Sequence, residues 1–380
     1  MILPRRGDFR DASRYAVALA SEMAAPLLRR AAHFMVPAPP TPPSAWRSGL
    51  IIGHGHIGDV LYRTCSLDAL ARGLPKCRWT YLTTRTGAQV LRDNPALNGI
   101  LSWMDGVNPE SLARPRIEHL RARRYDVVLC TESVRHHTAL QLALRMKVPN
   151  RVGFAHKGLS GLMTYPVSLR GAMSRPAQFR AMVDAITETT TDDPLRPRVY
   201  PGDADRAAAD IAWKLLGYDP GTPVIACSVT TRQAHGKVPP AFFARVLRDI
   251  AIRRPDIQIA LCGTLEDGTT LRTIADIVGA RAKLVVGELS ILGYAAFLAK
   301  CRAFLGSDSG PRHLANAAGI PVVFVRNLAS AEVEAGTYCE TEWDAAPHGS
   351  YLSEPAIASA LERVNPSAVA TRLIAMMGGD

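Results

Sequence analysis

Residues 53–59 read Gly-His-Gly-His-Ile-Gly-Asp, and they join a short apolar stretch to a run of helical character. Gly53, Gly55 and Gly58 have the spacing G-x-G-x-x-G, which folds as a tight turn between a parallel strand and a helix. Such a turn is typical of Rossmann-type α/β folds. Asp59 is unusual there, because its carboxylate would repel a pyrophosphate bound at the start of the helix. The stretch therefore predicts the fold and leaves its chemistry open.

Two chemistries fit this turn. In the first, the glycines bind a dinucleotide. An NAD site usually has an acid that binds the ribose, and residues 73–86 contain no acid. Arg85 still allows an NADP site, because an arginine can bind the 2′-phosphate. In the second, the turn presents Asp59 as an ionised carboxylate, which acts as a general base on a bound hydroxyl. A simpler role for Asp59 is to cap its own helix, and this stretch alone gives that role equal weight.

The rest of the chain alternates apolar strands with helices, which predicts parallel sheets covered by helices on both faces. The alternation stops near residue 200, so we expect two Rossmann-like domains, at 48–200 and 201–380. The expected strands are 50–53, 79–84, 125–130, 224–229, 258–262, 283–286, 303–306 and 322–326. The expected helices are 60–71, 87–93, 135–146, 204–216, 241–253, 270–278, 291–300 and 311–318.

Residues 1–47 form an appendage before the first domain. Residues 10–32 can be helical with four large apolar residues on one stripe, and a Pro-rich linker follows at 37–43. This helix either lies on a membrane surface or packs on its own globular body, and packing is slightly favoured. At the other end, the pattern leaves open that the C-terminal helix crosses back to the first domain.

The composition is typical of a globular protein, with 21% charged and 47% hydrophobic residues. No stretch has the roughly 20 uninterrupted apolar residues of a membrane-spanning helix, and acids among the first arginines argue against a signal peptide. The seven cysteines include no C-x-x-C, which indicates buried thiols in a reducing cytoplasm and argues against zinc. The formal charge of +11 either suits phosphate-bearing substrates or anionic lipid, or it reflects only a solvated basic surface. Without a nucleic-acid-binding motif, we expect no nucleic-acid partner.

Residues 304–319 read FLGSDSGPRHLANAAG and contain a candidate anion-binding site. A strand ends here and a helix begins with a proline, so the backbone N–H groups next to Ser309 and Gly310 point outward. A phosphate is stabilised at such a place, and we expect the neighbouring Arg312 to add positive charge. His313, on the first turn, either contacts the same anion or packs inside the fold.

Two further stretches are candidates for contacts with a phosphorylated ligand. The loop at 229–240, VTTRQAHGKVPP, follows a predicted strand, and Thr231, Arg232 and Lys237 can approach phosphate oxygens from it. The alternative is a solvated basic loop. Glu266 follows the next strand, and it either hydrogen-bonds a ribose or sugar or is a surface acid.

Four stretches together resemble glycosyltransferase family 9, the ADP-heptose:lipopolysaccharide heptosyltransferase family. They agree with the family in order and spacing over roughly residues 48–326, and the last resembles its most specific motif, D-[ST]-G-P-x-H-L-A-x-A-x-G-x-P. The stretches are GHGHIGDVLYRTCSLDALARGLP, YDVVLCTESVRHHTALQLALRMKVPNRVGF, TTRQAHGKVPPAFFARVL and GSDSGPRHLANAAGIPVV.

The resemblance implies a GT-B fold, in which two Rossmann-like domains face each other across a cleft, and inverting sugar transfer without a metal. It implies that Asp59 is the general base and that Lys237, Ser309 and Gly310 hold the donor diphosphate. The residues expected on the donor side are Thr231, Arg232, Lys237, Glu266, Asp308, Ser309, Gly310 and His313. On position alone, the residues expected on the acceptor side are Glu132, Arg135 and His136.

The resemblance makes ADP-heptose the default donor, with a glycan or lipid-linked acceptor at the cytoplasmic face of the inner membrane. The stretch NLASAEVEAGTYCETEWD at 327–344 departs from the family pattern near the donor, which leaves another nucleotide sugar open. Two other functions also stay open: an NADP-dependent oxidoreductase that uses the glycine turn, and a non-catalytic carbohydrate-binding protein on the same fold. For sugar transfer, we expect neither a metal nor a cofactor.

Overall fold

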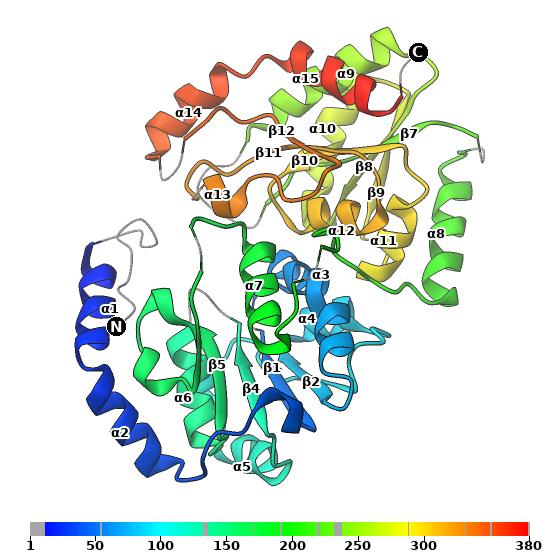
Figure 1. Ribbon diagram of the computed structural model, residues 1–380. Helices are drawn as coiled ribbons and strands as arrows, with labels where there is room; N and C mark the ends of the chain where they lie inside the picture. The colour runs from blue at the N-terminus through cyan, green and yellow to red at the C-terminus, as the bar shows by residue number, and fades with distance from the viewer. Residues whose placement is uncertain are drawn as a thin grey trace. The chain divides into compact units, whose positions relative to one another are not determined.

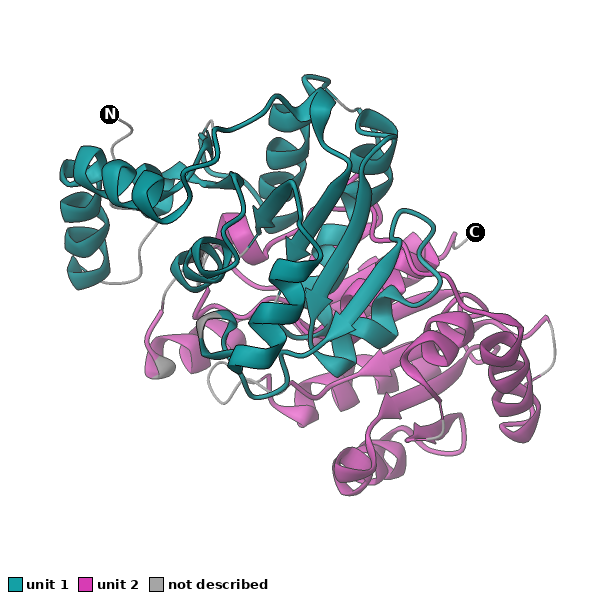
Figure 2. Cartoon of the chain, turned by 90° about the horizontal axis from the view of Figure 1, so that it is seen from below, with its two compact units in different colours: residues 1–193 teal, residues 194–380 magenta. Residues whose placement is uncertain are grey.

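The computed structural model places the chain in two compact units, residues 1–193 and 194–380 (Figure 2). Helices and strands are labelled as in Figure 1. The break falls shortly before the stretch near residue 200 where the alternation of strands and helices stops. The structure describes residues 12–53, 55–131, 136–169, 171–190, 192–218, 221–231, 238–287, 289–330, 332–349 and 352–378.

The first unit is built on a six-stranded parallel sheet with the order β3-β2-β1-β4-β5-β6. Its strands are β1 (Ser48–Ile52), β2 (Arg78–Thr83), β3 (Gly99–Ser102), β4 (Val127–Cys130), β5 (Asn150–Phe154) and β6 (Tyr165–Val167). Its helices are α1 (Ala12–Met23), α2 (Ala25–Met35), α3 (Ile57–Gly73), α4 (Arg85–Leu91), α5 (Arg114–Ala122), α6 (His136–Arg145) and α7 (Arg175–Thr187). Short 3-10 turns lie at Pro43–Ala45, Pro109–Ser111, Ala155–Lys157 and Ser160–Leu162.

The first sheet is buried on both faces, as a parallel sheet requires. Successive residues of a strand point to opposite sides, so Leu50 and Ile52 belong to one core cluster while Ile51, also fully buried, faces the other side. The cluster around Leu50 and Ile52 is completed by apolar residues of α5 and α6. On the sequence, this double burial appears as an uninterrupted apolar run in β1.

The second unit has the same architecture, with a parallel sheet in the order β12-β11-β10-β7-β8-β9. Its strands are β7 (Val224–Ser228), β8 (Gln258–Gly263), β9 (Ala282–Val286), β10 (Ala303–Ser307), β11 (Val322–Val325) and β12 (Glu342–Asp344). Its α-helices are α8 (Asp203–Leu215), α9 (Pro240–Arg253), α10 (Gly268–Val278), α11 (Ile291–Leu298), α12 (Gly310–Ala318), α13 (Glu332–Ala335), α14 (Glu354–Glu362) and α15 (Pro366–Met376). A 3-10 turn follows β8 at η6 (Leu265–Asp267).

Both sheets reverse their winding direction beside their first strand. In the first unit the chain moves from β1 outward to β3 and then returns to the other side of β1 with β4. In the second unit it moves from β7 to β9 and returns with β10. Loops that leave the carboxyl ends of the two central strands diverge at such a point, which is where open α/β sheets bind ligands. The predicted pair of Rossmann-like domains is confirmed.

The C-terminal helix belongs to the second unit. Val369, Ala370 and Leu373 of α15 are buried in the same core cluster as residues of α9, β10 and β11. The sequence pattern leaves open a return of this helix to the first domain, and the structure instead places its apolar face on α9.

The N-terminal helices pack on the first unit. Ser21 Oγ accepts a hydrogen bond of 2.9 Å from the Leu159 N–H, and the buried Glu22 carboxylate accepts hydrogen bonds from the Ser160 N–H and hydroxyl. Gly161 lies so close to α2 that a Cβ on it would stand 2.3 Å from the Ala25 carbonyl oxygen. Among the described residues, no helix is both long and apolar enough to cross a bilayer.

Candidate functional site

The glycine turn follows β1 and begins α3, and its glycines are needed for space. A Cβ on Gly53 would stand 2.0 Å from the hydroxyl oxygen of Tyr81. Gly55 has a φ of +142°, and a Cβ on it would stand 2.6 Å from Asp59 Oδ2. Gly58 lies in the first turn of α3. The turn therefore folds its own backbone closely over the Asp59 carboxylate.

Asp59 caps α3 and also pairs with an arginine from a distant helix. Its Oδ2 accepts a hydrogen bond of 2.9 Å from the backbone N–H of His56, the residue before the helix. Its Oδ1 accepts one of 3.1 Å from Arg175 Nη1, at the first residue of α7. The Asp59 side chain remains 27% exposed. The capping role is therefore present, and the same carboxylate is still open to an approaching hydroxyl.

This geometry suits a hydroxyl better than a phosphate. A dinucleotide-binding turn offers its N–H groups at the helix start to a pyrophosphate. Here Asp59 already accepts from the His56 N–H, and its carboxylate brings a negative charge to the place where the pyrophosphate would lie. A hydroxyl can instead donate a hydrogen bond to the carboxylate.

Sequence patterns do not point to Arg175. The residue belongs to α7, and it lies 116 positions from Asp59 along the chain. This helix is not among the expected ones, although its buried apolar residues Phe179, Met182, Val183 and Ile186 have helical spacing. Ser174, the residue before α7, and a proline in the first turn are further local signs of that helix. No such sign reveals that the Arg175 guanidinium reaches Asp59.

The acceptor-side candidates follow β4, the strand that returns beside β1. Thr131 directly after β4 donates from Oγ1 to the Ile52 carbonyl oxygen at 2.8 Å, which ties the two strand ends together at the switch point. Glu132 and Arg135 lie outside the described residues. His136 is the first residue of α6, and its side chain is likewise outside the described part.

In the second unit, the candidate anion-binding site lies at the end of β10. Ser307 Oγ donates to the Val229 carbonyl oxygen at 3.0 Å and ties β10 to the stretch after β7. Ser309 precedes α12 in an extended conformation, and its hydroxyl donates to the Ser307 carbonyl oxygen at 3.3 Å instead of capping the helix. Gly310 and a proline form the first turn. No described side chain caps α12, so its N-terminus is suited to an external anion.

Arg312 does not add its charge to this anion-binding site. Its side chain is fully buried beneath α12 and donates to Asp308 Oδ1 at 2.9 Å and to Glu342 Oε1 at 2.6 Å. It also donates to the carbonyl oxygens of Ala335 and Gly336. The expectation that Arg312 faces the ligand is therefore wrong, because two carboxylates and two carbonyls satisfy it internally. Asp308, whose side chain is 13% exposed, is held by the same contact.

His313 belongs to the same internal network. It is buried, and its Nδ1 lies 2.7 Å from the hydroxyl of Tyr338. Asn316 donates to that hydroxyl at 3.0 Å and to Glu342 Oε1 at 2.7 Å. Burial alone would raise the pKa of Glu342, but Arg312, Asn316 and the Tyr338 N–H lower it below its ordinary value. The network fixes the loop before β12 onto α12.

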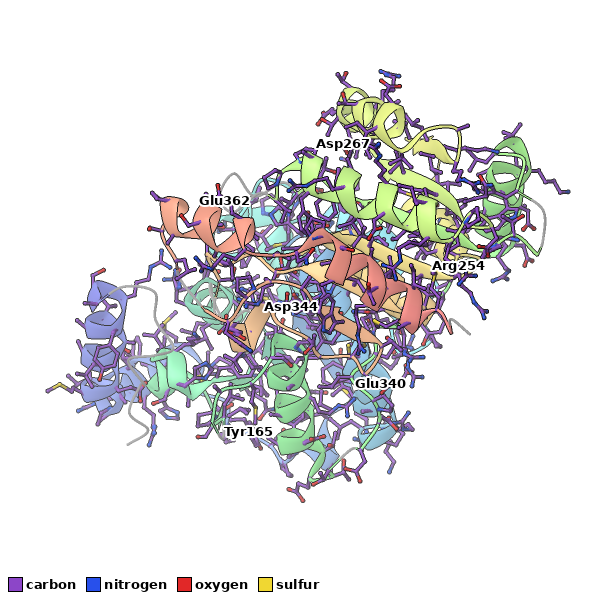
Figure 3. All side chains as sticks on the ribbon, turned by 90° about the horizontal axis from the view of Figure 1, so that it is seen from above. Tyr165, Arg254, Asp267, Glu340, Asp344 and Glu362 are labelled. Atoms are coloured by element: carbon purple, nitrogen blue, oxygen red, sulfur yellow. The ribbon has the colours of Figure 1, made fainter. Side chains whose placement is uncertain are left out.

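The remaining donor-side candidates follow β7, which pairs with β10, and β8, the next strand of the sheet. Thr231 follows β7 and is half-buried, whereas Arg232 and Lys237 lie outside the described residues. Glu266 is exposed in the turn η6 after β8. The neighbouring Asp267, labelled in Figure 3, accepts hydrogen bonds from the N–H and hydroxyl of Thr264 and so orders this turn.

The second unit thus brings several predicted residues to one edge. Because β10, β7 and β8 are parallel neighbours, Ser309, Thr231 and Glu266 all follow strands that end at the same edge of the sheet. The part-buried side chain of Asp308 and the buried side chain of His313 lie behind that edge and support it. This edge can hold an anionic group at α12 with polar groups beside it.

Comparison with known proteins identifies the family. A model described as glycosyltransferase family 9 (heptosyltransferase) matches residues 114–325, which is more than half of the chain. The match includes the stretch 308–313 but not Asp59. A search of curated protein sequences finds no match.

Solved structures show the same fold. A glycosyl transferase family 9 protein from Veillonella parvula has a TM-score of 0.72 at 18% identity, over 88% of this chain and 98% of that one. The ADP-heptose lps heptosyltransferase II of E. coli has a TM-score of 0.67 at 17% identity, over 87% and 98%. The E. coli heptosyltransferase WaaC with ADP has a TM-score of 0.61 at 15% identity, over 87% and 99%.

These similarities establish a GT-B-type pair of Rossmann-like domains, and the family match adds the kind of chemistry. Together with the Asp-Ser-Gly-Pro-x-His run at the start of α12, they lead to one conclusion. The chain belongs to glycosyltransferase family 9 and is a glycosyltransferase.

Proposed function

We propose that the chain transfers a sugar, by default heptose from ADP-heptose, to a hydroxyl of a glycan or lipid-linked acceptor. The transfer inverts the anomeric centre and uses no metal. The observation that carries the proposal is the Asp59 carboxylate, which follows β1 at the switch point of the first sheet and is part-exposed between the His56 N–H and Arg175. The ADP-heptose donor is supported by the names of the heptosyltransferase relatives.

The base acts on the acceptor. Asp59 accepts the proton of the acceptor hydroxyl while the hydroxyl oxygen attacks the anomeric carbon from the side opposite the leaving group. A single displacement of this kind inverts the configuration. General-base assistance accelerates such a step by roughly 10²–10⁴-fold.

The second unit acts on the leaving group. The bond from the anomeric carbon to the diphosphate breaks, and the negative charge grows on the departing nucleoside diphosphate. The N-terminus of α12 at Ser309 and Gly310 is suited to this charge, and the family resemblance adds Lys237. Fixed dipoles and a cation stabilise the departing charge here, so the step has no need of a divalent metal.

Transfer itself tests the proposal. The full chain is incubated in EDTA with ADP-heptose and a lipopolysaccharide core acceptor that lacks heptose, and released ADP and the product are measured. We expect ADP release that depends on the acceptor, and a product with inverted anomeric configuration by NMR. Retained configuration or full dependence on an added divalent metal would overturn the mechanism.

The donor is identified by binding. A thermal-shift panel compares ADP, GDP, UDP, NADPH and the corresponding nucleotide sugars. A nucleotide present at 100 times its Kd should stabilise the fold by about 2.7 kcal/mol. We expect ADP and its sugar conjugates to give the largest thermal shift. A larger shift with GDP or UDP would assign another donor. A shift with NADPH alone would support dinucleotide binding at the glycine turn.

A further inference from the structure

The helices α1 and α2 have two different faces. The inner face packs on the first unit and contains the buried residues Ala18, Glu22, Ala32 and Val36. The outer face, which we define by Val17, Met23, Leu27, Phe34 and Met35, carries apolar side chains into solvent. Both helices lie at the periphery of the first unit in two views (Figures 1 and 2).

The outer face concentrates exposed apolar side chains. Of the eleven large apolar residues exposed among the described residues, five belong to it. Leu27 is 72% exposed and Phe34 is 89% exposed, and their spacing of two helical turns places them on one side of α2. Met23, one turn before Leu27, continues the stripe, because backbone hydrogen bonds link the end of α1 to α2.

The charges around this stripe have one sign. Between residues 12 and 36 the exposed charged side chains are Arg14, Arg29 and Arg30. Glu22 is the only acid in this range, and it is 1% exposed and bonded to Ser160. The outer face is therefore apolar and basic, with no exposed acid among the described residues of these helices.

A comparison within the molecule shows that this combination is specific. The helix α8 also exposes two large apolar residues, Ile211 and Leu215, one turn apart. They share their helix with the exposed acids Asp203 and Asp210, which pair with Arg206 and with Lys300, and with the exposed Lys214. The exposed charges of α8 therefore balance, whereas those of α1 and α2 are all positive and attract an anionic surface.

We propose that the outer face of α1 and α2 docks the protein on an anionic phospholipid surface. The apolar side chains would enter the boundary between headgroups and acyl chains, and the arginines would contact lipid phosphates. A bilayer fits better than a protein groove, because the face exposes five large apolar residues and the exposed charged residues of its helices are all cationic. The inference concerns where the protein is held and does not depend on Asp59 or on the donor.

The test uses the full chain and vesicles of defined composition. Co-sedimentation compares vesicles of phosphatidylcholine alone with vesicles that also contain phosphatidylglycerol, at low and high salt. We expect binding mainly to the phosphatidylglycerol vesicles, weakened by salt because surface charges are screened. The double variant Leu27→Ser/Phe34→Ser should bind at least roughly tenfold more weakly, because two apolar side chains no longer enter the interface.

Two further variants make the test specific. The matched control Ile211→Ser/Leu215→Ser removes exposed apolar residues from α8 and should bind like the wild type. The variant Arg29→Gln/Arg30→Gln should lose roughly 25-fold in binding to the anionic vesicles, about fivefold for each arginine. Because Arg29 and Arg30 are exposed, this variant keeps the proposal testable even where the serine variant fails to fold.

Three results would overturn the proposal. The first is equal binding of the wild type to neutral and anionic vesicles at low salt. The second is an equal loss of binding in the α8 control. The third is a dimer, seen by light scattering, that the Leu27→Ser/Phe34→Ser variant splits without any change in vesicle binding, since the face would then belong to a second copy of the chain.

Discussion

Asp59 combines a structural role with the chemical role that we propose for it. Its Oδ2 closes the start of α3 through the His56 N–H, and its Oδ1 meets Arg175. These two contacts fix the direction of the carboxylate from two sides. A base held in this way loses little orientational freedom when the acceptor arrives, which is the condition for efficient proton transfer.

Removing Arg175 should therefore impair catalysis without impairing nucleotide binding. We expect Arg175→Met to lower kcat/KM by on the order of 10–100-fold, because the carboxylate can then leave its productive direction. Arg175→Lys should keep part of the activity. Arg114→Met, which breaks an exposed pair with Glu118, is the control and should change neither quantity. Full activity in Arg175→Met would show that the His56 N–H alone positions Asp59.

The charge of Glu342 stabilises the second unit through a buried ion pair. Its side chain is fully buried and pairs with Arg312 at 2.6 Å. Breaking a buried pair leaves an uncompensated charge, so Glu342→Gln should lower the free energy of unfolding by about 3–5 kcal/mol at neutral pH. Glu340, which is labelled in Figure 3, forms an exposed ion pair with Arg196. The control variant Glu340→Gln breaks this pair and should lower the free energy of unfolding by only about 0–1 kcal/mol.

The effect of Glu342 should depend on pH in a defined direction. Its pKa is lowered in the folded state, so its stabilising contribution is complete above the ordinary value of 4.5 and is lost as pH falls through the folded pKa. Denaturant unfolding across pH 3–7 should show the difference between wild type and Glu342→Gln shrinking below about pH 4.5. A difference that stays constant would contradict the ionised pair.

At the scale of elements, the turn between β1 and α3 depends on its glycines. Gly55→Ala would introduce a side chain at a φ of +142° and place its Cβ against Asp59. We expect a loss of about 1–3 kcal/mol in the free energy of unfolding and a loss of transfer activity. Gly106→Ala, at a φ of +64° with no atom within 4 Å, should cost stability but leave activity intact. Equal transfer activity in Gly55→Ala and Gly106→Ala would show that the turn is not required for sugar transfer.

The elements that sequence patterns predict are those with two buried faces or a strong local signal. The strands β1, β4, β7, β8, β10 and β11 are apolar runs, and the helix start at Gly310 is marked by Ser-Gly-Pro. The helix α7 is not among the expected elements, although its buried apolar residues have helical spacing. The short strands β3, β5 and β6 lack apolar runs, because neighbouring elements decide their burial. The same reason explains Arg312: its partner Glu342 lies 30 positions away, so nothing local reveals that the arginine is internal.

At the scale of the whole molecule, the two units divide the proposed reaction. Each repeats the same strand order and places its candidate residues at its own switch point. The first unit provides the part-exposed carboxylate of Asp59, and the second provides the uncapped start of α12. Acceptor activation and leaving-group stabilisation are therefore separable by mutation, one unit at a time.

The cysteines offer a test of the fold as a whole. All seven are buried, and burial raises the pKa of Cys77, Cys130 and Cys262 to about 12. Because the thiolate is the reactive form, the native protein at pH 8 should react with a thiol reagent far more slowly than the denatured chain, in which all seven should be labelled. Rapid labelling of any cysteine in the native state would contradict its placement.

The most direct measurement of the central claim is sugar transfer by Asp59→Asn. Asparagine can still accept from the His56 N–H, so the helix cap and the thermal shift with ADP should be retained, while the transfer rate should fall by about 10²–10⁴-fold. Asp205→Asn, at the equivalent capping position of α8, is the matched control and should transfer normally. Undiminished transfer by Asp59→Asn would contradict the assignment of Asp59 as the base.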